Sequence, residues 1–170
     1  VAFLLEQGVP PDRVLLLTFT NKAAKEMMRR VGEVLGSDIS SLWGGTFHSM
    51  GSRILRRHAA RVGYRPDFTI LDREDARDLL KACLDDAKID VKATRFPRAD
   101  VLAGIFSLAV NMDKPVSQIL DEEYDYFAGL ASEIQELQRR FAARKRSANV
   151  MDFDDLLVLW LKLLQEHEDI

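Results

Sequence analysis

Residues 15–24 read LLLTFTNKAA, and this stretch decides the fold. Three consecutive leucines predict a buried strand, because a parallel strand covered on both faces is apolar throughout. A polar turn with one aromatic side chain, Phe19, follows, and apolar residues then recur at helical spacing up to Leu35, with the helix ending at Gly36. The free N–H groups at the start of such a helix face whatever binds at the end of the strand.

A second stretch repeats this design. Residues 42–46 predict another short strand, and residues 47–61 predict a helix that begins at the sequence Thr-Phe-His-Ser. With an earlier helix over residues 2–8, the order is helix, strand, helix, strand, helix, which is typical of a parallel α/β unit. We therefore expect the two strand ends to lie side by side and to form one binding surface.

The chain then changes in character and predicts helices almost throughout. A third brief strand is expected at residues 68–71, and Asp72 with Asp75 marks the start of a helix. Pro97 opens another helix, a long helix follows Pro115, and a last helix opens at Asp152. The carboxylates of Asp152, Asp154 and Asp155 are interpreted as helix caps rather than as a catalytic pair.

Composition limits the class of protein. The chain has 170 residues, of which 47% are hydrophobic and 30% charged, so it can form a core and is not disordered by composition. The single cysteine, Cys83, lies among apolar helix positions, which predicts a buried and inert thiol and suits a reducing cytoplasm. No apolar run approaches the ~20 residues of a membrane span, and no signal peptide is visible. Because the chain begins with Val1, we expect a piece of a longer protein.

Charge is distributed unevenly along the chain. The net charge is −3, but residues 1–63 carry nine Lys/Arg and five Asp/Glu, a net of +4. Residues 147–170 carry one Lys and six Asp/Glu, a net of −5. The basic end contains both strand-turn-helix stretches, and local charge steers a polyanion better than total charge does.

Four motifs in order resemble the UvrD/PcrA/Rep-type superfamily 1 DNA helicases. They are TFTNKAAKEM at residues 18–27, GTFHSMGSRILRRH at 45–58, FTILDREDARDLLK at 68–81 and MDFDDLL at 151–157. The resemblance implies a mostly α-helical α/β fold, with an incomplete RecA-like parallel sheet of the P-loop NTPase type and an all-helical insertion. Residues 1–73 would be part of subdomain 1A, residues 74–150 subdomain 1B, and residues 151–170 a helix returning to 1A.

The nucleotide-binding motifs of that family are not expected in this chain. A phosphate-binding loop requires a Gly-Lys pair, and the sequence has none. The acidic run at residues 121–125 imitates a Walker-B motif, but only Ile119 and Leu120 precede it as a strand, and it lies before the MDFDDLL motif rather than after it. We interpret these acidic residues as the first turn of the long helix. ATP and Mg²⁺ would belong to the parent protein and not to this piece.

The resemblance also implies which residues contact DNA. These are Thr18, Phe19, Thr20, Asn21, Lys22, Thr46, Phe47, His48 and Ser49. Phe19 would stack on a base and the polar side chains would contact phosphates. The alternatives are a core position for Phe19, N-capping by Thr20 or Asn21, a solvated lysine at 22, and a structural hydrogen bond for His48. No catalytic residue and no metal ligand is predicted.

Two groups of arginines are further candidates for the DNA backbone. Arg53 and Arg57 share a helix side with Arg61, and Arg139 and Arg140 begin a basic run that reaches residue 146. The alternative for both groups is a solvated helix face.

The function expected from these observations is that of a helicase fragment. The parent would be an ATP-dependent 3′→5′ DNA helicase, and this piece would supply part of its single-strand track near the single/double-strand junction. Alone, it would bind DNA weakly and hydrolyse no ATP. Open strand edges at residues 13–18 or 42–46 would favour self-association. The alternative, favoured by the acidic C-terminal segment, is a helical protein-interaction module without a nucleic-acid role.

Overall fold

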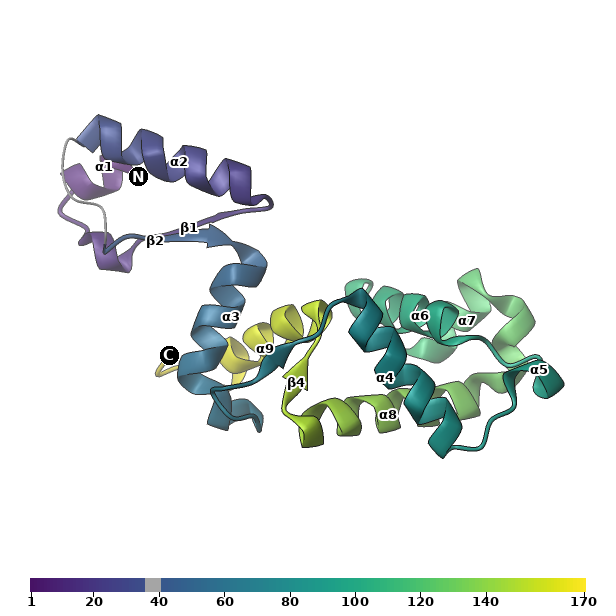
Figure 1. Cartoon of the computed structure of the whole chain (residues 1–170). Helices are drawn as coiled ribbons and strands as arrows, with labels where there is room; N and C mark the ends of the chain where they lie inside the picture. Colours follow the sequence, from purple (N-terminus) through teal and green to yellow (C-terminus); the bar gives the residue numbers. More distant parts are fainter. Residues whose placement is uncertain (36–40) are drawn as a thin grey trace. The chain divides into compact units, whose positions relative to one another are not determined.

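The computed structural model describes residues 1–35 and 41–170 (Figure 1). The predicted helix end at Gly36 lies outside the described residues. The chain divides into two compact units, Val1–Arg57 and His58–Ile170. It is mostly helical, and its strands form two small parallel sheets of two strands each, β1 with β2 and β3 with β4.

The first unit contains the predicted α/β order. Its elements are α1 (Ala2–Glu6), the 3-10 helix η1 (Pro11–Arg13), β1 (Leu15–Thr18), α2 (Asn21–Leu35), β2 (Trp43–Thr46) and most of α3 (Phe47–His58). The strands pair in parallel from Leu15 opposite Trp43 to Thr18 opposite Thr46. The incomplete RecA-like sheet is thus present as one strand pair, slightly shorter than predicted at the start of each strand. The predicted burial of the first strand is wrong, since Leu15 is 43% exposed and Leu16 and Leu17 are only half-buried.

Helix α2 packs against this strand pair. The contact depends on Gly44, since a Cβ atom at that position would lie 2.3 Å from Sδ of Met28. The absence of a side chain on the strand therefore allows a helix with a methionine on its inner face to approach closely.

The second unit is helical around one core. Its elements are η2 (Ala59–Val62), β3 (Thr69–Ile70), α4 (Arg73–Asp86), α5 (Val91–Thr94), α6 (Ala99–Asn111), α7 (Val116–Glu123), η3 (Asp125–Leu130), α8 (Ala131–Ala148), β4 (Val150–Met151) and α9 (Phe153–Glu166). Helices α4, α6, α7 and α8 enclose side chains such as Leu80, Ile105 and Leu137, which are almost completely buried. Cys83 belongs to this core and burial raises the pKa of its thiol, as expected of a buried cysteine.

The prediction of one continuous long helix after Pro115 is wrong. The segment forms α7, then η3, then α8, because the backbone at Tyr124 leaves helical geometry at φ −140° and ψ 47°. The acidic residues 121–125 accordingly end α7 and begin η3, and they are not the first turn of the long helix. The helix predicted from Pro97 begins two residues later, at Ala99, and α5 was not predicted.

The predicted third strand is present but pairs with a strand that was not predicted. Thr69 and Ile70 lie parallel to Val150 and Met151, immediately before α9. Two residues are too few to give a sequence pattern, so only the pairing itself reveals β4. The strand pair ties the end of α8 to the segment that precedes α4.

Both predicted acidic helix starts are confirmed as caps. The Asp72 carboxylate accepts hydrogen bonds from the backbone N–H groups of Glu74 and Asp75, and Asp152 with Asp155 forms a reciprocal capping box. Trp160 of α9 is buried. Across the described residues, no helix combines the length and the apolar character that crossing a bilayer requires.

Candidate nucleic-acid interface

The carboxyl ends of β1 and β2 bring the two Thr-Phe turns together. Thr18 pairs with Thr46 in the last register position of the sheet, so the residues after each strand emerge side by side. The rings of Phe19 and Phe47 have centroids 5.5 Å apart and planes inclined by 38°. The sequence predicted that both turns lie at one edge of the sheet, and the strand register confirms this.

Phe19 lies almost entirely in solvent. Its side chain is 89% exposed, whereas Phe47 beside it is half-buried. The alternative that Phe19 is a core aromatic is therefore wrong. An exposed ring supported by a second ring at its side can accept a planar ligand, because aromatic pairs prefer tilted or offset contacts that leave outer faces open.

The start of α2 is capped by Thr20. Its Oγ1 accepts a hydrogen bond of 3.1 Å from the backbone N–H of Ala23. Asn21 and Lys22 are the first two helical residues and both side chains are exposed. Their backbone N–H groups have no partner within the helix, so the positive end of the helix and the Lys22 ammonium face the same edge as Phe19.

The start of α3 is held by a local hydrogen-bond pair. Oγ1 of Thr46 accepts from the backbone N–H of Ser49 at 3.2 Å, and Oγ of Ser49 donates to the carbonyl oxygen of Thr46 at 2.9 Å. Thr46 is buried. These two side chains shape the turn that presents Phe47 and the half-buried His48 at the edge.

The structure separates the predicted arginines from this edge. The guanidinium carbons of Arg53 and Arg57 lie 4.1 and 4.5 Å from the ring centroid of Trp43, the first residue of β2. Arg61 follows the end of α3 and pairs with Asp169 at 2.7 Å, so the three arginines do not form one stripe.

Arg139 and Arg140 are engaged within their own helix. Both pair with Glu136, at 2.8 and 2.9 Å, and hydrogen bonds from Arg140 and then Arg139 lower the pKa of that carboxylate. The basic run is therefore partly neutralised on the surface of α8. Trp43 was not singled out from the sequence, because the helical spacing of Arg53 and Arg57 does not show which ring they cover.

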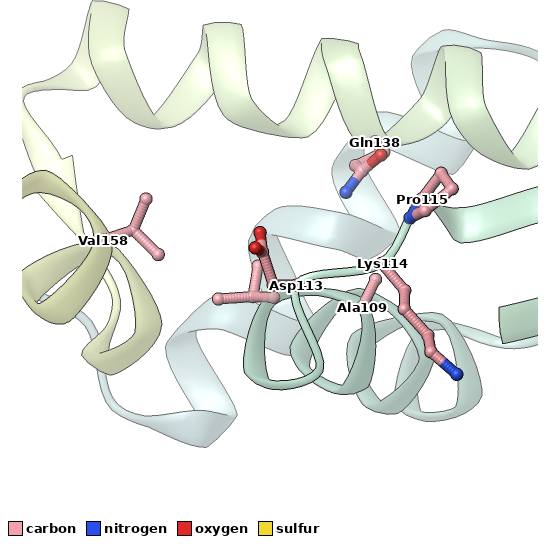
Figure 2. A pocket seen from close by; sticks show the side chains of 7 residues that line it. Ala109, Asp113, Lys114, Pro115, Gln138 and Val158 are labelled. Atoms are coloured by element: carbon pink, nitrogen blue, oxygen red, sulfur yellow. The ribbon is translucent and has the colours of Figure 1, made fainter. Parts of the chain in front are cut away.

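A hollow lies in the helical unit. It has a volume of about 380 Å³ and is lined by Ala109, Val110, Asp113, Lys114, Pro115, Gln138 and Val158 (Figure 2). The Lys114 ammonium pairs with Glu122 at 2.5 Å. None of the predicted DNA contacts lines this hollow, so the candidate site is an open edge rather than a pocket.

These features define a class of protein. Two parallel strands whose carboxyl ends open helices at a shared edge, followed by a mostly helical unit, form part of a RecA-like fold of the P-loop NTPase type. The family model described as the UvrD/REP helicase N-terminal domain matches residues 1–170. The chain therefore belongs to this family, and the resemblance stated from the motifs is confirmed.

Similarity to individual proteins supports the same family assignment. The chain is 36% identical over its full length to an ATP-dependent DNA helicase PcrA of Staphylococcus aureus strain Mu50, covering 23% of that protein. It is 36% identical over 97% of its length to an ATP-dependent DNA helicase PcrA of Staphylococcus epidermidis, covering 22% of that protein. The chain thus spans less than a quarter of the length of the curated relatives it matches.

Proposed function

We propose that the chain is part of an ATP-dependent DNA helicase with 3′→5′ polarity and forms one side of its single-strand track. The family and the similarity to PcrA helicases support this proposal. The observation that carries it is Phe19, which is 89% exposed at a strand edge where two helices begin. A large apolar ring in solvent costs solvation free energy unless a ligand covers it.

Each side chain at the edge has a distinct role in this proposal. The Phe19 ring stacks on a base, and Phe47 supports it at 5.5 Å. The Lys22 ammonium, the Asn21 amide and the first N–H groups of α2 contact phosphate oxygens. Thr18, Thr20, Thr46, His48 and Ser49 complete the edge, with Thr20, Thr46 and Ser49 also fixing its shape. Such contacts bind single strands largely without regard to sequence and weaken as salt rises.

We extend the proposal to the arrangement of the parent protein. Residues 1–73 and 151–170 belong to subdomain 1A and residues 74–150 to subdomain 1B, whose Arg139 and Arg140 lie toward the single/double-strand junction. ATP and Mg²⁺ bind to other parts of the parent. Because this sequence contains no Gly-Lys pair, the chain alone hydrolyses no ATP.

A titration with fluorescently labelled oligothymidine tests the stacking role. Stacking on one aromatic ring contributes about 1–3 kcal/mol, so Phe19→Ala weakens binding by about 5- to 150-fold. The matched control is Phe3→Ala in α1. Phe3 is also a highly exposed phenylalanine of the same unit, at 69%, but it lies away from the strand ends.

The outcomes separate the proposals. Equal affinities for Phe19→Ala and Phe3→Ala would exclude stacking at residue 19. If the wild-type chain does not bind DNA at low salt, the alternative function, a helical protein-interaction module, is favoured. If the chain hydrolyses ATP, it contains a nucleotide site after all.

Copies of the chain also associate through strand edges in this proposal. Each strand of the β1–β2 pair has one side without a partner strand among the described residues, and Leu15 is 43% exposed. Unpaired edges template pairing with another chain. Sedimentation velocity over a range of concentrations measures this association, and a strictly monomeric chain would contradict it.

A further inference from the structure

Two arginines of α3 stand over one tryptophan of β2. Arg53 and Arg57 are spaced by four residues, so they project from the same side of the helix. Their guanidinium carbons lie 4.1 and 4.5 Å from the ring centroid of Trp43, well within the ~6 Å range of a cation–π contact. One ring therefore positions two positive charges.

These charges have no carboxylate partner. Within residues 1–35 and 41–170, no Asp or Glu oxygen lies within 4.0 Å of Arg53 or Arg57, and both side chains are exposed. Arg29 and Arg30 of α2 differ, since both pair with Glu26 and lower its pKa to about 2. The unit thus neutralises some arginines and leaves two others side by side without compensation.

Stacking on an aromatic face leaves a guanidinium able to bind an anion. The contact uses the flat face of the group, while its five N–H donors lie in the plane and point outward. Such a planar fork binds a phosphate through two parallel hydrogen bonds. The stack also limits the rotamers of both side chains, so less conformational entropy is lost when an anion binds.

The stack lies apart from the Phe19–Phe47 edge. Trp43 begins β2 and Phe47 follows its last residue, and at a rise of ~3.3 Å per residue the two positions are about 13 Å apart along the strand. One phosphate cannot reach both places, so a ligand that contacts both must be extended.

We propose that Trp43 is a positioning residue that holds Arg53 and Arg57 as a second phosphodiester-binding site. It contacts the backbone of the same DNA strand that stacks on Phe19, and in this respect it rests on the proposed function. The two arginines over Trp43 supply positive charge, whereas the Phe19–Phe47 edge supplies a ring on which a base stacks. The two sites therefore differ in how their contributions depend on salt.

The test is the salt dependence of oligothymidine binding by the 170-residue chain. Each phosphate contact to a single strand adds ~0.7 to the slope of log K against log salt concentration. Trp43→Leu is expected to reduce the magnitude of this slope by about 0.7 to 1.4, and Trp43→Phe, which retains an aromatic face, to restore most of it. Phe19→Ala weakens binding and leaves the slope unchanged.

A second set of variants guards against a purely structural effect. Arg53→Gln with Arg57→Gln replaces two exposed side chains and is expected to reduce the slope as much as Trp43→Leu. Adding Trp43→Leu to that pair is expected to change the slope no further. Far-ultraviolet circular dichroism establishes that each variant is folded, and the arginine pair decides the question if Trp43→Leu unfolds.

The results distinguish the two proposals. If Phe19→Ala weakens binding but neither Trp43→Leu nor the arginine pair changes the slope, the second site is excluded and the stacking edge stands. If the wild-type chain binds no oligothymidine at low salt, both proposals fail.

Discussion

The two compact units each contain a pair of phenylalanines and a basic cluster, and these differ in their exposure. In the unit Val1–Arg57, Phe19 is 89% exposed, and two arginines that no carboxylate of the described residues pairs with stand over Trp43. In the unit His58–Ile170, Phe106 and Phe141 are buried and stacked, with ring centroids 6.4 Å apart. Side chains that we propose for ligand binding in the first unit thus correspond to buried, packed side chains in the second unit.

Lys145 shows how the second unit treats a charge. Its side chain is only 7% exposed, and its ammonium lies 2.5 Å from Oδ2 of Asp152 and 2.7 Å from Oδ2 of Asp155. Burial disfavours the charged lysine, but Asp155 and Asp152 outweigh it and raise the pKa of Lys145. Burial raises the pKa of Asp155, the neighbouring Asp152 carboxylate raises it further, and Lys145 opposes both by lowering it. The cluster joins the end of α8 to the capping box of α9.

The largest expected effect is that of Lys145→Met. The substitution keeps the volume of the side chain but leaves two largely buried carboxylates without a cation, so unfolding of the helical unit becomes easier by about 3 kcal/mol at neutral pH. Urea denaturation followed by labelling of the Cys83 thiol measures this, because Cys83 is buried in that core. The control is Arg140→Met, which breaks an exposed pair and costs less than about 1 kcal/mol.

The same variant has an expected pH dependence. Without the lysine, the folded-state pKa of Asp155 rises further above its unfolded value, so the folded state binds a proton more tightly. The stability of Lys145→Met then increases as pH falls from 7 toward 5, and its deficit against wild type shrinks. A deficit that is equal at both pH values would show that Lys145 contributes packing rather than charge. In the wild type, the contribution of Lys145 is complete below its unfolded pKa and is lost as pH rises through its raised folded pKa.

A smaller effect is expected in the first unit for Gly44→Ala. The added Cβ would lie 2.3 Å from Sδ of Met28, and since that side chain is flexible the cost is about 1–2 kcal/mol. Amide hydrogen exchange measures it as faster exchange in β1 and β2, with the core of the helical unit unchanged. The control Gly104→Ala, whose Cβ meets nothing within 4 Å, is expected to stabilise α6 by about 0.5–1 kcal/mol. Faster exchange throughout both units would show that the two units do not open independently.

Sequence patterns predicted the elements that have strong local signals. Helix α2 spans Asn21–Leu35 because its apolar spacing and its Thr20 cap agree, and the strand-turn-helix stretches placed Phe19 at the shared edge. No sequence pattern marked the break at Tyr124, and the pairing of β3 with β4 was missed because it joins residues that are distant in the sequence. The Trp43 stack was missed for the same reason, since the helical spacing of Arg53 and Arg57 does not show what lies beneath them.

The contrast between an exposed binding edge and a self-stabilised helical unit can be tested by nuclear magnetic resonance. Backbone amide shifts of the ¹⁵N-labelled chain are followed as oligothymidine is added at low salt. We expect the largest shifts at residues 18–22 and 46–49, with little change in the core of the helical unit. Shifts concentrated in the helical unit, or none at residues 18–22, would contradict DNA binding at this edge.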